Sequence, residues 1–100
     1  MKYTLTARHF KVHDTIKDFA DKEMTKLERF YDGIIKAEVI LSYERASNSV
    51  KTAEIIVHAN HHHTFTAKEH SDEFHISIEE AAKKVVAQLK KYNDKLKAKH

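Results

Sequence analysis

The chain has 100 residues, of which 41% are hydrophobic and 33% are charged, and its formal net charge at pH 7 is +3. These values predict one folded domain, residues 1–100, and exclude a disordered chain or a two-lobed enzyme built around a cleft. Cysteine is absent and Gly33 is the only glycine, which excludes disulfides, thiolate metal sites and glycine-rich phosphate loops.

The first part of the chain predicts a short strand followed by a helix. Residues 3–7 alternate apolar and polar side chains, as a strand does. Residues 14–30 repeat apolar side chains at helical spacing. We expect Asp14 or Thr15 to cap the start of this helix. We expect Gly33, just past its end, to terminate it in the left-handed conformation.

The middle of the chain predicts three strands. Residues 36–45 and 52–60 each carry apolar residues at alternate positions, and the polar stretch 46–49 joins them. A third run, residues 63–69, follows Asn60-His61-His62, which we expect to form a tight turn. The face that this third strand buries stays open, because apolar and threonine residues alternate along it.

The last element is a long helix over residues 72–96, capped by Ser71 or Asp72 and followed by a short basic tail over residues 97–100. Its apolar stripe consists of Phe74, Ile78, Ala81, Ala82, Val85, Leu89 and Tyr92. The predicted order is therefore β-α-β-β-β-α. An α+β fold with a four-stranded mixed sheet and both helices on one face buries all of these stripes together.

The basic charge is concentrated at one end of the chain. Residues 83–100 carry seven lysines and one acidic residue, whereas residues 1–82 have a net charge of −3. At about 100° per residue, three rows of polar side chains form: Lys84, Gln88, Lys91 and Lys95; Lys83, Lys90 and Lys97; and, on the first helix, Lys22, Lys26 and Arg29. If the helices pack side by side, these rows form one positive surface suited to RNA phosphates. For one helix alone, a merely solvated surface is an equally good interpretation.

Nine histidines leave a second hypothesis open. His61-His62-His63, with His58 or His70, contains ligand types that bind a divalent metal. However, neighbouring side chains on extended backbone point to alternate sides, and no carboxylate is close in sequence. We therefore favour a polar turn and expect neither a metal nor a cofactor.

Catalysis has little support in the sequence, which contains no nucleophile elbow, so we do not expect an enzyme or a small-molecule substrate. Few aromatic residues are placed to stack on bases, which favours shape recognition of structured RNA. No apolar run approaches the roughly 20 residues of a membrane span, and the N-terminus lacks the apolar core of a signal peptide. With the absence of cysteine, this agrees with a cytoplasmic protein.

Several segments in order resemble the short ribosome hibernation-promoting factor and ribosome-associated inhibitor family. They are Lys26-Leu27-Glu28, Val39-Ile40-Leu41-Ser42, Ala53-Glu54-Ile55 with Asn60, the run from Asp72 to Glu79 (DEFHISIE), and Gln88-Leu89-Lys90-Lys91. Two positions depart from the family pattern. His61 and His62 stand where a glycine often follows the turn asparagine, and Ala87 stands where arginine is frequent. Lacking an acidic tail and a second domain, the chain is similar to the short type, which needs a partner factor to pair ribosomes.

This resemblance implies a domain related in shape to double-stranded RNA-binding domains. It implies docking on the RNA of the small ribosomal subunit, between head and body, where messenger and transfer RNA bind. RNA contacts carry over to Lys22, Lys26, Lys84, Gln88 and Lys91, and the charge rows add Arg29, Lys83, Lys90 and Lys95. Within the last helix, we expect Lys84, Gln88 and Lys91 to contribute most to RNA binding. The free protein is expected to be a monomer, and a general structured-RNA-binding module is the alternative.

Overall fold

A computed structural model describes residues 1–44 and 50–98 of the chain. Its elements are β1 (Lys2–Ala7), α1 (Asp14–Leu27), β2 (Ile34–Glu44), β3 (Val50–Ala59), β4 (Thr64–Ser71) and α2 (Phe74–Ala98). The predicted order β-α-β-β-β-α is confirmed. The predicted connection 46–49 lies outside the described residues. Within those residues, neither helix is long and apolar enough to cross a membrane.

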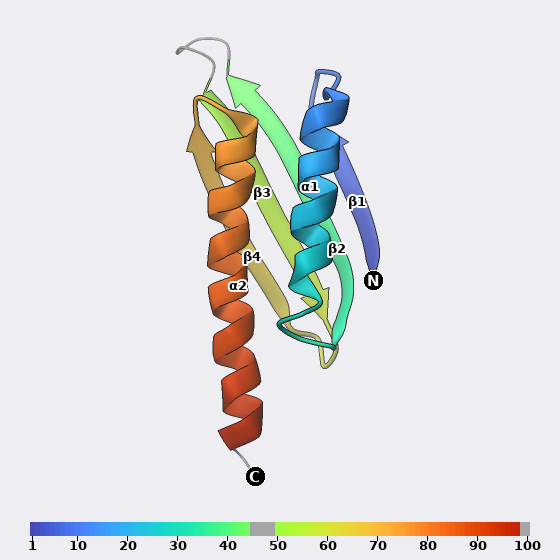
Figure 1. The fold of residues 1–100 in the computed structure, drawn as a ribbon, viewed down its shortest axis with the longest axis vertical. Helices are drawn as coiled ribbons and strands as arrows, with labels where there is room; N and C mark the ends of the chain where they lie inside the picture. Colours follow the sequence, from blue (N-terminus) through green and yellow to red (C-terminus); the bar gives the residue numbers. More distant parts are fainter. Residues whose placement is uncertain (45–49, 99–100) are drawn as a thin grey trace.

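The four strands form one mixed sheet in the order β1-β2-β3-β4. β1 runs parallel to β2, while β2, β3 and β4 pair antiparallel. Both helices cover the same face of this sheet, α1 on the side of β1 and β2 and α2 on the side of β3 and β4 (Figure 1). The parallel pair follows from this arrangement, because α1 is the crossover that returns the chain to the end where β1 began.

Alternation along the strands separates the two faces of the sheet. Val39 on β2 and Ile55 on β3 are fully buried under the helices, while their sequence neighbours point to the other face. The register pairs Ile55 with Ala67 and Val57 with Phe65, so β4 buries Phe65 and Ala67. The face of the third strand, which the sequence left open, is thereby set by its pairing with β3.

The start and end of α1 differ from the sequence prediction. The residue before its first turn is His13, which has extended backbone and forms no side-chain capping bond. Asp14 and Thr15 are already helical, so the prediction that either caps the helix was wrong. The helix also ends at Leu27, three residues earlier than predicted. Beyond it, the Arg29 amide donates to the Lys26 carbonyl and the Phe30 amide to the Leu27 carbonyl, and these tighter i to i−3 bonds close the last turn.

Gly33 does not terminate α1 in the left-handed conformation, since no glycine in the described chain has a positive φ. A side chain is excluded there for another reason. A Cβ atom on Gly33 would lie 2.6 Å from Asn60 Oδ1 and 2.6 Å from ring carbons of Tyr31. The Tyr31 hydroxyl donates to that same Asn60 oxygen, and the Asn60 amide donates to the Gly33 carbonyl at 2.8 Å. Gly33 therefore permits close packing between the α1–β2 connection and the β3–β4 turn.

The predicted tight turn between β3 and β4 is confirmed, and its backbone is strained. His61 and His62 have φ angles of 59° and 62°, the combination of a type I′ turn. The Ala59 amide donates to the His63 carbonyl at 2.8 Å, which closes the hairpin. Left-handed backbone costs an L residue with a side chain about 1–2 kcal/mol. The two histidines therefore lower the stability of the fold, and interactions elsewhere in the protein offset this strain.

We expect His62→Gly to raise the free energy of unfolding. Glycine adopts left-handed backbone without strain, and the free energy regained in this way exceeds the entropy that glycine adds to the unfolded chain. The expected net gain in stability is up to about 1 kcal/mol. Thermal unfolding measures it, and His63→Gly is the matched control. The His63 ring centroid lies 4.3 Å from that of Tyr92, so the control should lose stability. A lower melting temperature for His62→Gly would contradict this account of the turn.

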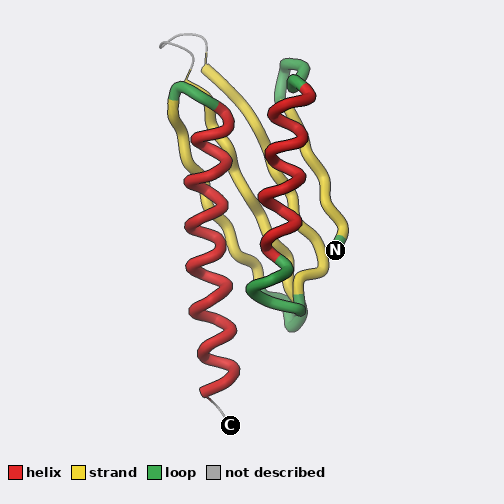
Figure 2. The backbone as a smooth tube through the Cα atoms, in the orientation of Figure 1, coloured by secondary structure: helices red, strands yellow, loops and turns green. Residues whose placement is uncertain are grey.

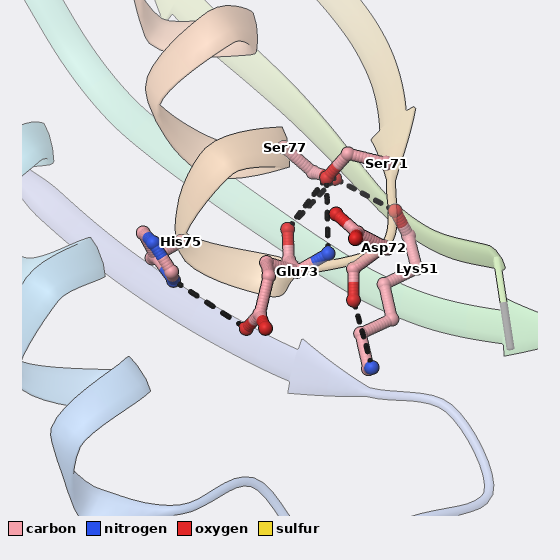
Figure 3. Close-up of polar contacts among 6 residues, drawn as sticks. All are labelled: Lys51, Ser71, Asp72, Glu73, His75 and Ser77. Carbon is pink, nitrogen blue, oxygen red and sulfur yellow. Dashed lines mark hydrogen bonds and ion pairs between the residues drawn. The ribbon is translucent and has the colours of Figure 1, made fainter.

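A buried serine ties the start of α2 to the sheet (Figure 3). Ser77 is fully buried, and its hydroxyl donates to the Lys51 carbonyl on β3 at 2.7 Å. It also shares a hydrogen bond of 2.7 Å with the hydroxyl of Ser71, which in turn accepts the Glu73 amide at 3.2 Å. α2 begins at Phe74, two residues later than predicted. Ser71 therefore binds the amide of Glu73, just before the helix, and the prediction that Ser71 or Asp72 caps the helix was wrong.

Removing the Ser77 hydroxyl should destabilise the fold moderately. In Ser77→Ala the Lys51 carbonyl and the Ser71 hydroxyl each lose a partner, which costs about 1–2 kcal/mol. Urea denaturation measures the change. His75→Ala is the control on the same turn, because the contact of His75 with Glu73, at 3.7 Å, lies on the surface and is worth at most about 0.5 kcal/mol. Equal midpoints for the two variants would refute a structural role for Ser77.

Candidate nucleic-acid interface

The two helices lie side by side, as the proposed RNA surface requires (Figure 2). A groove runs between them. It is lined by Glu23, Lys26, Phe30, Glu79, Ala82, Lys83, Val86, Ala87 and Lys90. The structure therefore brings Lys26 of the α1 row together with Lys83 and Lys90 of one α2 row. Ala87, the departure from the family pattern, lies within the same groove.

Carboxylates offset much of the charge in this groove. Lys26 Nζ lies 3.2 Å from a Glu23 oxygen. Lys83 Nζ lies 3.4 Å from Glu79 and 3.6 Å from Glu80, and these two carboxylates raise the pKa of Lys83, Glu80 most strongly. The groove is consequently closer to neutral than the rows of lysines alone indicated.

Lys90 differs from its neighbours in the groove. Its Nζ lies over the ring of Phe30, 5.1 Å from the centroid, a cation–π contact worth about 0.5–1 kcal/mol at an exposed site. Among the described residues it has no carboxylate within 4.0 Å. The ring holds the ammonium group in place without neutralising it, so Lys90 keeps its charge for an anionic partner.

Lys84 and Gln88, from the other α2 row, lie on the opposite flank of the helix, beside β4. Lys84 Nζ contacts Glu69 Oε2 at 2.8 Å, and Gln88 Nε2 donates to the Thr66 carbonyl at 2.8 Å. These two residues therefore contact the sheet edge and do not join the α1 row. The expectation of one continuous surface therefore fails for Lys84 and Gln88, which contact β4 on the side of α2 away from α1.

The end of α2 extends past the ends of the strands (Figure 1), and several cations without a carboxylate partner lie on its last turns and beside them. The cations of this region, which we call the basic end, have no carboxylate within 4.0 Å in the described part of the chain. They are Arg29, Lys90, Lys91, Lys95 and Lys97. Arg29 and Lys97 line one hollow together with the acidic Asp32, and this hollow joins the end of α1 to the end of α2. Lys22, exposed on α1, shares a second hollow with Arg29.

The histidine turn is separate from these cations. His61 and His62 are exposed, His63 packs on Tyr92, and His58 Nε2 lies 2.8 Å from Glu38 Oε2 on the open face of the sheet. This contact lowers the pKa of Glu38. Within residues 1–44 and 50–98, no three histidine or acidic side chains are grouped as metal ligands.

The match to known proteins extends over nearly the whole fold. Residues 3–97 match the family described as sigma 54 modulation protein / S30EA ribosomal protein. The chain belongs to this family. The match starts in β1 and ends in the last turn of α2, so it includes every element that carries the candidate interface.

Individual members of the family are similar over their full length. A protein from Acidithiobacillus ferridurans named ribosome hibernation promoting factor is 33% identical over 82 residues, covering 79% of this chain and all of that protein. The protein of the same name from Escherichia coli K12 is 26% identical over 97 residues, covering 97% and 98% of the two chains. The crystal structure of the Thermus thermophilus Protein Y N-terminal domain superposes with a TM-score of 0.79 at 26% identity, covering 92% of this chain and 99% of that one.

One cation of the basic end was not among the predicted contacts. Lys97 was assigned to a tail over residues 97–100, but α2 includes it and ends at Ala98. Residues 99 and 100 lie outside the described chain. The row of Lys83 and Lys90 already placed Lys97 about two helical turns beyond Lys90, and this periodicity was the signal that the helix continues.

Proposed function

We propose that this chain is a ribosome hibernation factor that binds the RNA of the small ribosomal subunit between head and body and keeps messenger and transfer RNA from binding. Its membership of the family, over residues 3–97, is the observation that carries the proposal. The relatives named ribosome hibernation promoting factor support the ribosome as partner. The action is by occupancy, without a chemical step, in the cytoplasm where ribosomes work.

The charge distribution supports RNA as the surface that is bound. The basic end presents five exposed cations, four of them on α2 and the fifth, Arg29, just past the end of the neighbouring α1. Long basic side chains at this spacing neutralise backbone phosphates, which positions a protein on structured RNA without reading its sequence. We therefore assign the main phosphate contacts to Arg29, Lys90, Lys91 and Lys95, with Lys22 and Lys26 extending them along α1.

RNA can be bound by Lys83, Lys84 and Gln88 only if these side chains first give up contacts that they make within the protein. Their side chains already contact Glu79, Glu69 and Thr66, respectively. Each of these contacts is exposed and weak enough to exchange for a phosphate. We propose that they contribute less than the basic end does.

Sedimentation of ribosomes with and without the protein tests this function. We expect the chain to co-sediment with small subunits at low salt, to be released as salt rises, and to inhibit translation in an extract. Undiminished translation at saturating protein would refute the proposal. If free duplex RNA displaces the protein as well as small subunits do, the general structured-RNA module is the better description. The same profile shows whether ribosomes pair, with or without a partner factor.

A further inference from the structure

A pocket of about 330 Å³ lies at the end of the molecule where both helices begin, opposite the basic end. It is lined by Phe10, Lys11, Val12, His13, Ile16, Tyr43, Lys51 and Phe74. Pockets for small ligands start at roughly 300 Å³, so the volume suits one small planar molecule. None of the residues assigned to RNA contacts above lines it.

The inner wall of this pocket is aromatic. The ring of Phe10 stacks on Phe74, with centroids 5.1 Å apart and planes 8° from parallel, and Tyr43 meets Phe10 edge-on at 5.2 Å. Val12 and Ile16 add apolar surface and are half-buried. A flat, rigid apolar wall of this kind favours a planar aromatic ligand, because stacking on such a wall loses little conformational entropy.

The rim of the pocket is cationic. Among the lining residues that the structure describes, Lys11, His13 and Lys51 are basic and none is acidic. Lys51 Nζ is held by one hydrogen bond of 2.9 Å to the Asp72 carbonyl (Figure 3). An ammonium group has three donors, so two remain for a ligand. An aromatic wall beside fixed positive charge matches a ligand that is aromatic at one end and anionic at the other.

The backbone beside the pocket also favours an anionic ligand. His13 precedes the first turn of α1, and no side chain caps that turn. Uncapped amides at a helix start favour negative charge. The uncapped helix start strengthens the case for an anionic ligand, but the case rests on the side chains that line the pocket.

We propose that this pocket binds one unstacked nucleotide, with its base against the wall formed by Phe10 and Phe74 and its phosphate between Lys11 and Lys51. A nucleotide has a planar base, which matches the aromatic wall of the pocket, and an anionic phosphate, which matches its basic rim. The nucleotide is either a free mononucleotide or an unpaired residue of an RNA strand, since both present this chemistry. The site does not depend on the ribosome, so it stands apart from the function proposed above.

Nuclear magnetic resonance titrations of the whole chain test the site. We expect adenosine monophosphate to shift the resonances of Phe10, Lys11 and Val12 saturably, and uncharged adenosine to bind about tenfold more weakly, the usual worth of one charge-assisted hydrogen bond. Single-stranded tetra-adenylate binding tighter than the mononucleotide would assign the site to RNA, and the reverse order would assign it to a free nucleotide. Shifts with an apolar peptide but with neither nucleotide ligand would overturn the proposal in favour of a protein partner.

Two variants and one control locate the binding. Lys11→Gln should weaken adenosine monophosphate binding about tenfold, and Phe10→Leu, which keeps apolar volume but removes the ring, by a similar factor. Lys17→Gln makes the same charge change on an exposed residue of α1 outside the pocket and should leave the affinity unchanged. Equal loss in Lys11→Gln and Lys17→Gln would overturn the site, because it would show attraction to net charge alone. Ribosome sedimentation is scored separately, so failure here is distinguishable from failure of the hibernation function.

Discussion

Reversing the charge of Lys91 and Lys95 is expected to weaken binding to small ribosomal subunits by at least about 100-fold, since two charge-assisted contacts are lost and replaced by repulsion. Both side chains are exposed and have no carboxylate partner within the described chain. Two fewer phosphate contacts should also reduce the slope of log affinity against log salt by about 2. Sedimentation or filter binding across a salt series measures both quantities in Lys91→Glu/Lys95→Glu.

The matched control places the same charge change on the open face of the sheet. Lys2 on β1 and Lys68 on β4 are exposed and alternate with residues that face the helices. Lys2→Glu/Lys68→Glu should bind nearly as well as the unmodified chain. Glutamate near the end of α2 also opposes the helix dipole, at about 0.3–1 kcal/mol per residue, so the melting temperature is recorded for both variants. Equal binding losses in the two double variants would contradict the location of the interface.

The lysines show how far sequence reasoning extends toward this interface. Helical periodicity depends on backbone geometry alone, so it grouped Lys84 with Gln88 and Lys83 with Lys90 correctly. It does not say what each row faces, because that depends on the packing of α2 on the sheet. Glu69, the partner of Lys84, lies on β4, 15 residues earlier in the sequence, so no helical spacing links the two. The pairs of Lys83 with Glu79 and Glu80, in contrast, lie at i,i+4 and i,i+3 spacing and were predictable.

The fold itself was largely predictable because each segment carries a clear period. Alternation marked the strands, and the 3.6-residue repeat marked both helices. The errors lie at the ends of elements, where one local rule competes with contacts made elsewhere. A histidine with extended backbone, rather than Asp14 or Thr15, precedes α1, and a glycine after a helix is often left-handed but is not so here. The role predicted for Gly33 came from a rule about helix ends. A glycine is required there because Asn60 lies too close for a side chain, and only the folded sheet brings Asn60 near.

Gly33→Ala is therefore expected to destabilise the fold by about 2–3 kcal/mol, through overpacking and weakening of the part-buried hydrogen bond from Tyr31 to Asn60. The added Cβ would lie 2.6 Å from Asn60 Oδ1 and from the Tyr31 ring. That ring cannot easily withdraw, because Tyr31 is buried and packs edge-on against Tyr92 at 5.3 Å. For a domain of this size the melting temperature should fall by about 10–20 °C. Thermal unfolding measures it, with Asp32→Ala at the exposed neighbouring position as control.

A second substitution at the same position separates the two explanations for the glycine. Asparagine tolerates left-handed backbone better than alanine does, so a left-handed Gly33 would make Gly33→Asn the milder variant. Its larger side chain must enter the space held by Asn60 and Tyr31, so we expect Gly33→Asn to be at least as destabilising as Gly33→Ala. A higher melting temperature for the asparagine variant would restore the helix-terminating role. The expected order instead makes Gly33 a packing residue, which holds the end of α1, and with it Arg29, beside the last turns of α2.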